Sequence, residues 1–228
     1  MNNKPFVSDI RSVLRSSTSF LFDFDGVLAD SEPFFRKSWN TALKPWGHSI
    51  SEEDYWKYWS SLGEGLLGEI RRHGLSGIDI PRVKKRQKYF YERFVSDNMI
   101  PLFPEAKKLL EILSSNNNYP KHSFCIASNT SITLIRHILI AAAVPVPVIV
   151  GGDDLKRKPS PDIFLRASSI LRCNPSSAIV FEDSWKGITA AKSGGFISVL
   201  VLNSYNRNLK IESDFVIDGI ASLIDILN

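Results

Sequence analysis

Short apolar runs that each stop at a polar residue are the feature of this chain that most constrains its fold. Five such runs cover residues 20–22, 124–127, 146–150, 178–181 and 197–202, and residues 215–217 are a shorter sixth candidate. Helical patterns lie between them, over residues 105–113, 131–142, 161–171 and 187–192. An apolar run bounded by polar residues is typical of a strand buried in a parallel sheet. Since parallel strands need crossover connections, the alternation predicts an α/β fold with a doubly wound parallel sheet.

Residues 31–100 interrupt this alternation. They contain 12 of the 25 aromatic residues and four of the five tryptophans, and they carry 12 Lys/Arg against 9 Asp/Glu. Their apolar residues recur with helical spacing, and no convincing strand is found among them. Because the first strand precedes this segment and the others follow it, we predict an α/β core of residues 1–30 and 101–228. Residues 31–100 are predicted to form an inserted helical domain.

The overall composition excludes several classes of protein. With 228 residues, 43% hydrophobic and 23% charged, the chain is not of a disordered, collagenous or coiled-coil type. No stretch approaches the roughly 18 apolar residues of a membrane span, and the first 19 residues have no apolar segment typical of a secretory signal. Two cysteines form neither a disulfide framework nor a paired metal motif. We therefore expect a cytoplasmic protein. The net charge of +4 suits a small anionic substrate as well as nucleic acid.

Two aspartates follow the first apolar run, in residues 22–27 (FDFDGV). Their i, i+2 spacing in an extended segment puts Asp23 and Asp25 on one side, and Gly26 permits a sharp turn. Two carboxylates this close repel each other unless a cation or a proton lies between them. The pair therefore suits a hard cation, with one carboxylate as nucleophile and the other transferring protons. An Asp-rich turn is the structural alternative, and the motif alone does not decide between them.

Other strand ends carry complementary groups. Ser128 begins a Ser-Asn-Thr segment that could bind an anion or simply cap a helix. Lys158 lies in a loop stiffened by two prolines, and Glu182 and Asp183 follow the fourth run, where capping is again an alternative. Ligands of open parallel sheets bind beyond the carboxyl ends of the strands. Together these residues offer acids for a divalent metal and donors for a phosphoryl group, which indicates metal-assisted phosphoryl transfer.

Four segments of the chain together resemble the haloacid dehalogenase superfamily, in the subgroup of β-phosphoglucomutase and phosphoglycolate-type phosphatases. Residues 22–31 (FDFDGVLADS) are similar to its first motif, 128–130 (SNT) to its second, 158–162 (KPSPD) to its third and 181–195 (FEDSWKGITAAKSGG) to its fourth. Their order and spacing agree over nearly the whole chain. The resemblance implies a Rossmann-like core, and it implies that the helical insertion is a C1-type cap domain.

The resemblance also implies roles for the acids. Asp23 would attack phosphorus and become an aspartyl-phosphate, and Asp25 would protonate the leaving oxygen and then deprotonate the attacking water. Mg²⁺ would be held by Asp23, the backbone carbonyl of Asp25 and Asp183, with Glu182 nearby or acting through water. This agrees with the preference of Mg²⁺ for few carboxylates together with phosphate and water. Dehalogenases of the superfamily lack the second aspartate, so Asp25 argues against dehalogenation.

The same resemblance implies that Ser128, Asn129 and Lys158 bind the phosphoryl oxygens. Arg86 stands near the position of a cap lysine of the family and is a candidate substrate-binding residue. We expect a small phosphorylated metabolite as substrate, no nucleic-acid or membrane partner, and a monomer.

Two departures from the family pattern bear on the reaction. Phe35 stands where mutases and many relatives have a histidine, and Leu66 falls at the position of a mutase arginine. An apolar side chain cannot replace the charge-assisted grip of arginine on a second phosphate. A phosphatase is therefore favoured over a β-phosphoglucomutase-type sugar-phosphate mutase. A catalytically idle, phosphate-binding regulatory module is the alternative of another class, and the presence of Asp23 and Asp25 argues against it.

Three other signals do not lead to a function. Residues 63–68 match G-x-G-x-x-G but follow no apolar strand, so a dinucleotide site is not predicted. Residues 82–93 carry six basic side chains among aromatic ones, but their apolar residues recur with helical spacing, which indicates a helix with a solvated basic face. The four histidines show no metal-ligand spacing.

Overall fold

The computed structural model describes residues 7–115 and 123–227. Its chain divides into two compact units, one of Met1–Ala29 and Leu102–Asn228 and the other of Asp30–Pro101. Within the described residues, no helix combines the length and the apolar character needed to cross a lipid bilayer.

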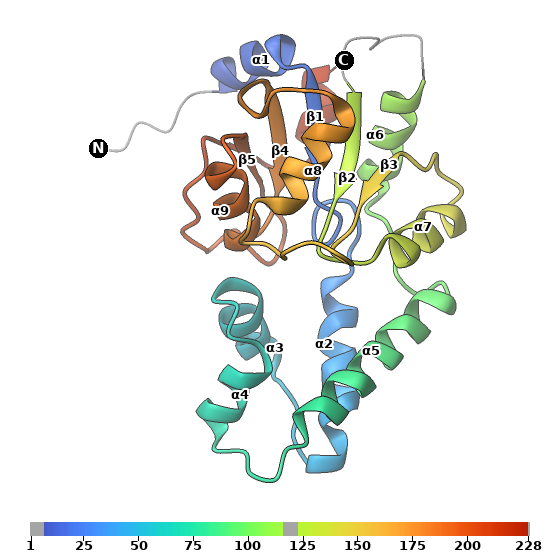
Figure 1. Ribbon diagram of the computed structural model, residues 1–228, viewed down its shortest axis with the longest axis vertical. Coiled ribbons are helices and arrows are strands. Elements are labelled where there is room, and N and C mark those ends of the chain that lie inside the picture. Colours follow the sequence, from blue (N-terminus) through green and yellow to red (C-terminus); the bar gives the residue numbers. More distant parts are fainter. Residues whose placement is uncertain (1–6, 116–122, 228) are drawn as a thin grey trace. The chain divides into compact units, whose positions relative to one another are not determined.

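A six-stranded parallel sheet forms the centre of the first unit (Figure 1). Its order is β3-β2-β1-β4-β5-β6, so successive strands proceed from β1 to one edge and from β4 to the other. The strands are β1 (Ser19–Phe22), β2 (Ser123–Ala127), β3 (Val148–Val150), β4 (Ala178–Glu182), β5 (Ile197–Val201) and β6 (Phe215–Ile217). Because every pairing is parallel, the carboxyl ends of all six strands point the same way and lie along one side of the sheet. Strand β1 lies between β2 and β4.

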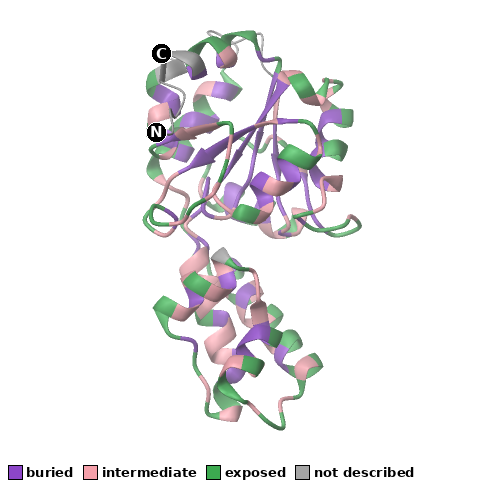
Figure 2. Cartoon of the chain, turned by 90° about the vertical axis from the view of Figure 1, so that its left-hand side faces the viewer, coloured by how far each residue is buried: buried purple, intermediate pink, exposed green. Residues whose placement is uncertain are grey.

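Apolar residues cover both faces of the central strands, as expected for a buried parallel sheet. On one face Leu21 and Cys125 belong to a buried cluster with Phe164 of α8 and Ala190 of α9. On the other face Phe22 stacks on Phe181, with ring centroids 4.8 Å apart. The central strands β1 and β4 are accordingly buried along their whole length, and most of the sheet is purple in Figure 2. The helices of the unit are α1 (Val7–Ser16), α6 (Pro104–Ser114), α7 (Ile132–Ala141), α8 (Asp162–Leu171), α9 (Trp185–Ser193) and α10 (Gly219–Leu227), with a 3₁₀ turn η3 (Pro175–Ser177).

Every secondary-structure element of the second unit is helical. Its elements are α2 (Glu32–Leu43), the 3₁₀ turn η1 (Lys44–Trp46), α3 (Glu52–Asp54), the π-helical turn η2 (Tyr55–Ser61), α4 (Gly65–His73) and α5 (Ile80–Ser96). Its aromatic residues build an apolar core of its own, in which Tyr55, Trp59 and Leu66 are buried. Phe35 stacks on Tyr91 with ring centroids 3.9 Å apart. The aromatic content of this segment thus gives a small helical unit enough apolar surface to bury.

The chain enters and leaves the second unit through two adjacent segments. Ala29 and Leu102 form an antiparallel bridge, and the backbone N–H of Phe103 donates to Leu28 O at 2.9 Å. On the side of the second unit, the N–H of Asp30 donates to Pro101 O at 3.0 Å. The two linking segments therefore form a short ladder of backbone hydrogen bonds.

The predicted α/β class with a doubly wound parallel sheet is confirmed, including the short sixth strand. The third strand begins at Val148 rather than at residue 146, and the intervening Pro147 has no N–H to donate to a neighbouring strand. Helices α1 and α10 were not predicted. The alternation of strands and helices indicates a helix only between two consecutive apolar runs. Helix α1 precedes the first run and α10 follows the last one.

Candidate active site

The first candidate residues lie directly after β1, the strand between β2 and β4. The backbone N–H of Asp23 donates to Phe181 O at 2.9 Å and so extends the pairing with β4. Gly26 then turns the chain with a φ of +76°, and a Cβ atom on it would lie 2.0 Å from Asp183 Oδ2. A glycine is therefore needed both for the turn and for the close approach of this loop to Asp183.

Lys158 connects two buried acids from neighbouring strand ends. Its Nζ donates to Asp23 Oδ1 at 2.6 Å, to Glu182 Oε1 at 2.7 Å and to the carbonyl of Ala127 at 2.8 Å. All three ammonium hydrogens are therefore used. The backbone N–H of Lys158 donates to Asn129 Oδ1 at 3.0 Å, which fixes the loop that carries the lysine. The structure thus brings the predicted Asp23, Lys158 and Glu182 together, and Asn129 is hydrogen-bonded to the backbone of the loop that carries Lys158.

Asp25 is held by the loop that follows β2. Its Oδ2 accepts hydrogen bonds from Ser128 Oγ at 3.0 Å and from Thr130 Oγ1 at 2.7 Å. Ser128 Oγ in turn accepts from the backbone N–H of Thr130 at 3.0 Å. Thr130 was quoted within the second motif but was not among the predicted site residues. Its hydroxyl makes the shorter of the two contacts and helps to fix the orientation of the Asp25 carboxylate.

Glu182 has both of its oxygens occupied by donors. Oε1 accepts from Lys158, and Oε2 accepts from the backbone N–H groups of Asp183 at 3.0 Å and Ser184 at 3.1 Å and from Ser184 Oγ at 2.9 Å. A Cβ atom on Gly187 would lie 1.7 Å from Glu182 Cδ, so this glycine makes room for the carboxylate against α9. The N-cap of α9 is Ser184, whose Oγ accepts from the Gly187 N–H at 3.1 Å, whereas Glu182 holds the loop before that helix and fixes Lys158.

Asp183 is oriented by two asparagines that the sequence patterns did not indicate. Its Oδ2 accepts from Asn203 Nδ2 at 3.0 Å, and its backbone carbonyl accepts from Asn206 Nδ2 at 2.8 Å. Asn203 Nδ2 also donates to Gly26 O at 3.0 Å, so it joins the loops after β1 and β4. Asn203 follows the fifth apolar run directly. The rule that ligands gather at the carboxyl ends of parallel strands could have identified it.

The charges of this site are unbalanced toward the negative. Burial and the neighbouring carboxylates of Glu182 and Asp25 raise the pKa of Asp23 well above its usual value, although Lys158 acts in the opposite direction. Burial alone would lower the pKa of Lys158, but the charges of Asp23 and Glu182 raise it above its ordinary value. Four carboxylates gather at this site, counting Asp183, and Lys158 contacts two of them.

This donor set fits a divalent cation. Asp23, Glu182 and Asp183 each offer a carboxylate oxygen, and these oxygens lie within 4.8 Å of one another. Hard oxygen ligands and excess negative charge are what Mg²⁺ requires. A cation bound between these carboxylates would act against the burial and the neighbouring charges that raise the pKa of Asp23.

Arg86 lies in the second unit, on α5. Its Nε donates to Ala42 O at 3.3 Å and its guanidinium donates to Thr41 O at 3.4 Å, which satisfies carbonyls near the end of α2. The guanidinium also lies 5.3 Å from the centroid of the Phe90 ring. Its predicted role in substrate binding stays a prediction.

Comparison with known proteins agrees with this geometry. The family model "haloacid dehalogenase-like hydrolase" matches residues 18–195. A probable pseudouridine-5'-phosphatase of Drosophila melanogaster is 29% identical, with 83% of each chain covered. A phosphorylated carbohydrates phosphatase of Thermotoga maritima is 26% identical over 82% of this chain and 86% of its own. The crystal structure of CbbY from Rhodobacter sphaeroides in complex with phosphate has the same fold, with a TM-score of 0.73, 24% identity and coverage of 91% and 96%.

The chain therefore belongs to the haloacid dehalogenase-like hydrolases. Within that family it is an enzyme of the phosphatase class. The predicted family, fold and enzyme class are confirmed.

Proposed function

We propose that this enzyme is a Mg²⁺-dependent phosphatase that hydrolyses a small phosphorylated metabolite through an aspartyl-phosphate at Asp23. The observation that carries the proposal is the convergence of Asp23, Asp25, Lys158 and Asp183 from the loops after β1, β3 and β4. The phosphatase relatives and the phosphate-bound CbbY structure support this class of substrate.

The chemistry assigns one step to each aspartate. A carboxylate oxygen of Asp23 forms a bond to phosphorus while the bond from phosphorus to the leaving oxygen breaks, and Asp25 gives its proton to that oxygen. Water then attacks the phosphorus of Asp23-phosphate, the bond from phosphorus to the Asp23 oxygen breaks, and Asp25 takes up a proton from that water. Inorganic phosphate leaves and both carboxylates return to their first state. The hydroxyls of Ser128 and Thr130 keep the carboxylate of Asp25 in one orientation.

The remaining polar groups hold the phosphoryl oxygens and the metal. Lys158 places its positive charge beside the nucleophile, where it lowers the repulsion between Asp23 and an anionic substrate. Asp23, Asp183 and the backbone carbonyl of Asp25 would hold Mg²⁺, which would supply charge neutralisation for the phosphoryl group. Glu182 acts by fixing Lys158 and the loop that carries Asp183.

Two packed side chains favour a phosphatase over a sugar-phosphate mutase. A mutase must grip a second phosphate in its cap domain, and this chain has Phe35 and Leu66 at the positions of the family's histidine and arginine. Phe35 stacks on Tyr91, and Leu66 is 5% exposed within the apolar core of the second unit. Neither side chain can donate a hydrogen bond to a phosphate, so these two positions cannot bind the second phosphate group that a mutase requires.

Phosphate release from a panel of phosphorylated metabolites tests the phosphatase proposal. We expect turnover with MgCl₂, none with excess EDTA, and none for Asp23→Asn, with unchanged circular dichroism. Asp154→Asn, an exposed aspartate of another loop, is the matched control and is expected to keep full activity. Activity near that of the wild type in Asp23→Asn would exclude the covalent mechanism.

The mutase alternative is tested separately by ³¹P NMR. The substrate is β-glucose 1-phosphate with Mg²⁺ and a bisphosphate primer. We expect inorganic phosphate as the product of any turnover. Glucose 6-phosphate that accumulates faster than free phosphate would establish the mutase instead.

A further inference from the structure

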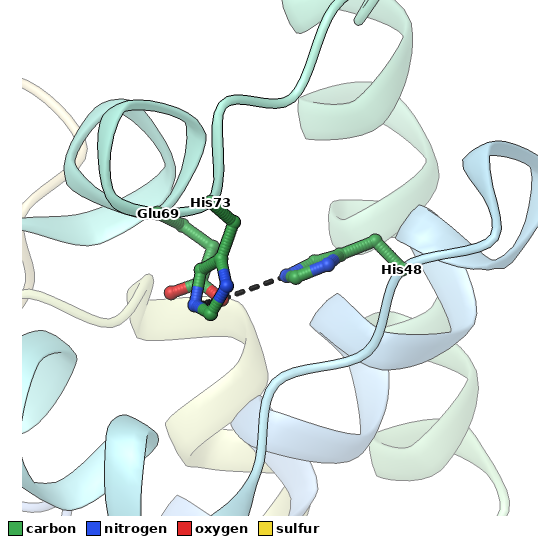
Figure 3. A group of neighbouring side chains, drawn as sticks. All are labelled: His48, Glu69 and His73. Carbon is green, nitrogen blue, oxygen red and sulfur yellow. Dashed lines mark hydrogen bonds and ion pairs between the residues drawn. The ribbon is translucent and has the colours of Figure 1, made fainter.

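Two histidines and a glutamate converge within the second unit (Figure 3). His48 lies in the segment after η1, and Glu69 and His73 lie one turn apart on α4. Nε2 of His48 is 2.7 Å from Glu69 Oε1, and Nε2 of His73 is 3.4 Å from the same oxygen. The cluster His48–Glu69–His73 therefore aims two imidazole nitrogens and one carboxylate oxygen at a common point.

Glu69 is held from the side opposite to the histidines. Its side chain is fully buried, and its Oε2 accepts hydrogen bonds from Trp59 Nε1 at 2.8 Å and from Arg72. Burial alone would raise the pKa of Glu69, but the hydrogen bonds from Trp59 and His48 and the charge of Arg72 lower it. One oxygen of the carboxylate is thus fixed by Trp59 and Arg72, and the other is turned toward the histidines.

The charges around this cluster leave room for a cation. Arg72 is shared between Glu69 and Glu64, and Asp54 Oδ2 lies 3.7 Å from His73 Nε2. Lys57 also interacts with Asp54, so these three carboxylates stand against two basic side chains, and one negative charge remains before the imidazoles are counted. A divalent cation bound by the cluster would compensate it.

We propose that His48, Glu69 and His73 form a Zn²⁺ site, with Nε2, Oε1 and Nε2 as the respective ligand atoms. Two imidazoles and one carboxylate are a ligand set that Zn²⁺ prefers, and Mg²⁺ favours oxygen ligands instead. Tetrahedral Zn²⁺ with ligand bonds of about 2.0–2.1 Å places its ligand atoms about 3.3 Å apart. The separation between His73 and Glu69 matches this value, and His48 needs to withdraw by less than about 1 Å.

Two further features suit a metal ion at this place. Trp59 and Arg72 fix the ligating carboxylate as outer partners commonly do in zinc sites. The His73 side chain is 38% exposed and the His48 side chain 13% exposed, which gives an ion a path from solvent. Asp54 or a water molecule completes the coordination. The bound ion ties the segment at His48 to α4 and stabilises the second unit, separately from the chemistry at Asp23.

Titration of the EDTA-treated, dialysed full-length chain with ZnCl₂ in excess MgCl₂ tests the proposal. Excess Mg²⁺ occupies the oxygen ligands of the site at Asp23 and leaves the histidine site open. We expect one Zn²⁺ bound per chain and a higher midpoint of thermal unfolding. Co²⁺ is expected to give the visible absorption of a tetrahedral site with nitrogen ligands.

Three variants locate the binding. His73→Gln, and independently His48→Gln, are expected to weaken Zn²⁺ binding by at least ~100-fold, since loss of an outer partner alone costs 10–100-fold. Trp59→Phe keeps an aromatic ring in this core, removes one hydrogen bond to Glu69 and is expected to weaken binding about 10–100-fold. His137→Gln, on an exposed position of α7, is the matched control and keeps wild-type binding.

Two results would overturn the proposal. One is no Zn²⁺ bound in the presence of excess Mg²⁺. The other is wild-type Zn²⁺ affinity in folded His73→Gln and His48→Gln. Either result would leave the cluster as a hydrogen-bonded network that joins His48 to α4.

Discussion

Lys158 Nζ lies 2.6 Å from Asp23 Oδ1, and the same ammonium group lies 2.7 Å from Glu182 Oε1. The side chains of Lys158 and Glu182 are 3% and 0% exposed, and that of Asp23 is 10% exposed. A buried ion pair contributes little to stability compared with apolar packing, but removal of one partner leaves the other charges uncompensated. We therefore expect the lysine to contribute to stability as well as to the phosphate binding proposed above.

Replacement of Lys158 by methionine is expected to lower the free energy of unfolding by about 3–5 kcal/mol, because Asp23 and Glu182 remain buried without their cation. Urea denaturation without metal measures this change. Lys156→Met, at an exposed position of the same loop, is expected to stay within about 0.5 kcal/mol of the wild type. The double variant Lys158→Met/Glu182→Gln should recover part of the loss. An unchanged urea midpoint in Lys158→Met would show that the carboxylates do not need the lysine.

Asp25→Asn is expected to reduce the turnover of alkyl phosphates by a factor on the order of 10²–10⁴, the usual contribution of a positioned acid or base. With p-nitrophenyl phosphate the loss should be smaller, because the nitrophenolate leaves without a proton. Steady-state rates with both substrates give the comparison. Equal losses for the two substrates would assign Asp25 a structural or metal-binding role instead of general acid catalysis.

Thr130→Val removes one hydrogen bond to the carboxylate of Asp25 and keeps the shape of the side chain. Hydrogen bonds to charged groups contribute about 1.5–3 kcal/mol, so kcat for alkyl phosphates is expected to fall by roughly 10–100-fold with little change in KM. Thr130→Ser restores the hydroxyl and should restore most of the rate. Thr133→Val, on the exposed side of α7, is the control. A change confined to KM would contradict a positioning role.

Cys125 provides a prediction about pH. Burial raises the pKa of its thiol from 9.0 to about 12, so the folded chain keeps a proton that the unfolded chain releases above pH 9. The unfolded state then binds fewer protons, and the free energy of unfolding must fall as pH rises from 9 toward 12. By pH 10 this one thiol should lower the free energy of unfolding by about 1.4 kcal/mol.

Cys125→Ala removes the titrating thiol and serves as the reference for this measurement. The cavity that it creates destabilises the chain at every pH. The difference in unfolding free energy between the wild type and Cys125→Ala should therefore shrink by about 1.4 kcal/mol between pH 8 and pH 10. A difference that stays constant would mean that the thiol titrates alike in the folded and unfolded chains.

The strands of the core and the acids at their ends were predictable from local patterns. A buried strand and the acid that follows it, such as Asp23 or Glu182, can be recognised within one short stretch of sequence. Because the strands are parallel, these acids lie at the same end of the sheet. The same patterns did not indicate how the polar groups pair. Thr130 reaches Asp25 from 105 residues away, and Asn203 reaches Gly26 from 177 residues away. Such contacts depend on the order of the strands in the sheet, which local sequence does not specify.

The histidine cluster shows the same limit more sharply. Metal-ligand spacings in sequence indicate a site when the ligands lie on one turn or one helix. Glu69 and His73 lie four residues apart on one helix, but a pattern of two histidines does not include this pair because Glu69 is a glutamate. His48 lies 21 residues before Glu69, so no local spacing connects it to the other two. The absence of a spacing pattern among the four histidines was therefore a poor guide to what the fold brings together.

The ladder that joins Leu28 and Phe103, Ala29 and Leu102, and Asp30 and Pro101 has a consequence for how such an enzyme can change. Because the ends of the inserted segment are already held together, its length adds little to the entropic cost of folding the core. Residues between positions 30 and 101 can be lengthened, shortened or exchanged while the strand registers and the acids of the core stay as they are. Selection for a new substrate can then act on one block of sequence, and selection for catalysis on another.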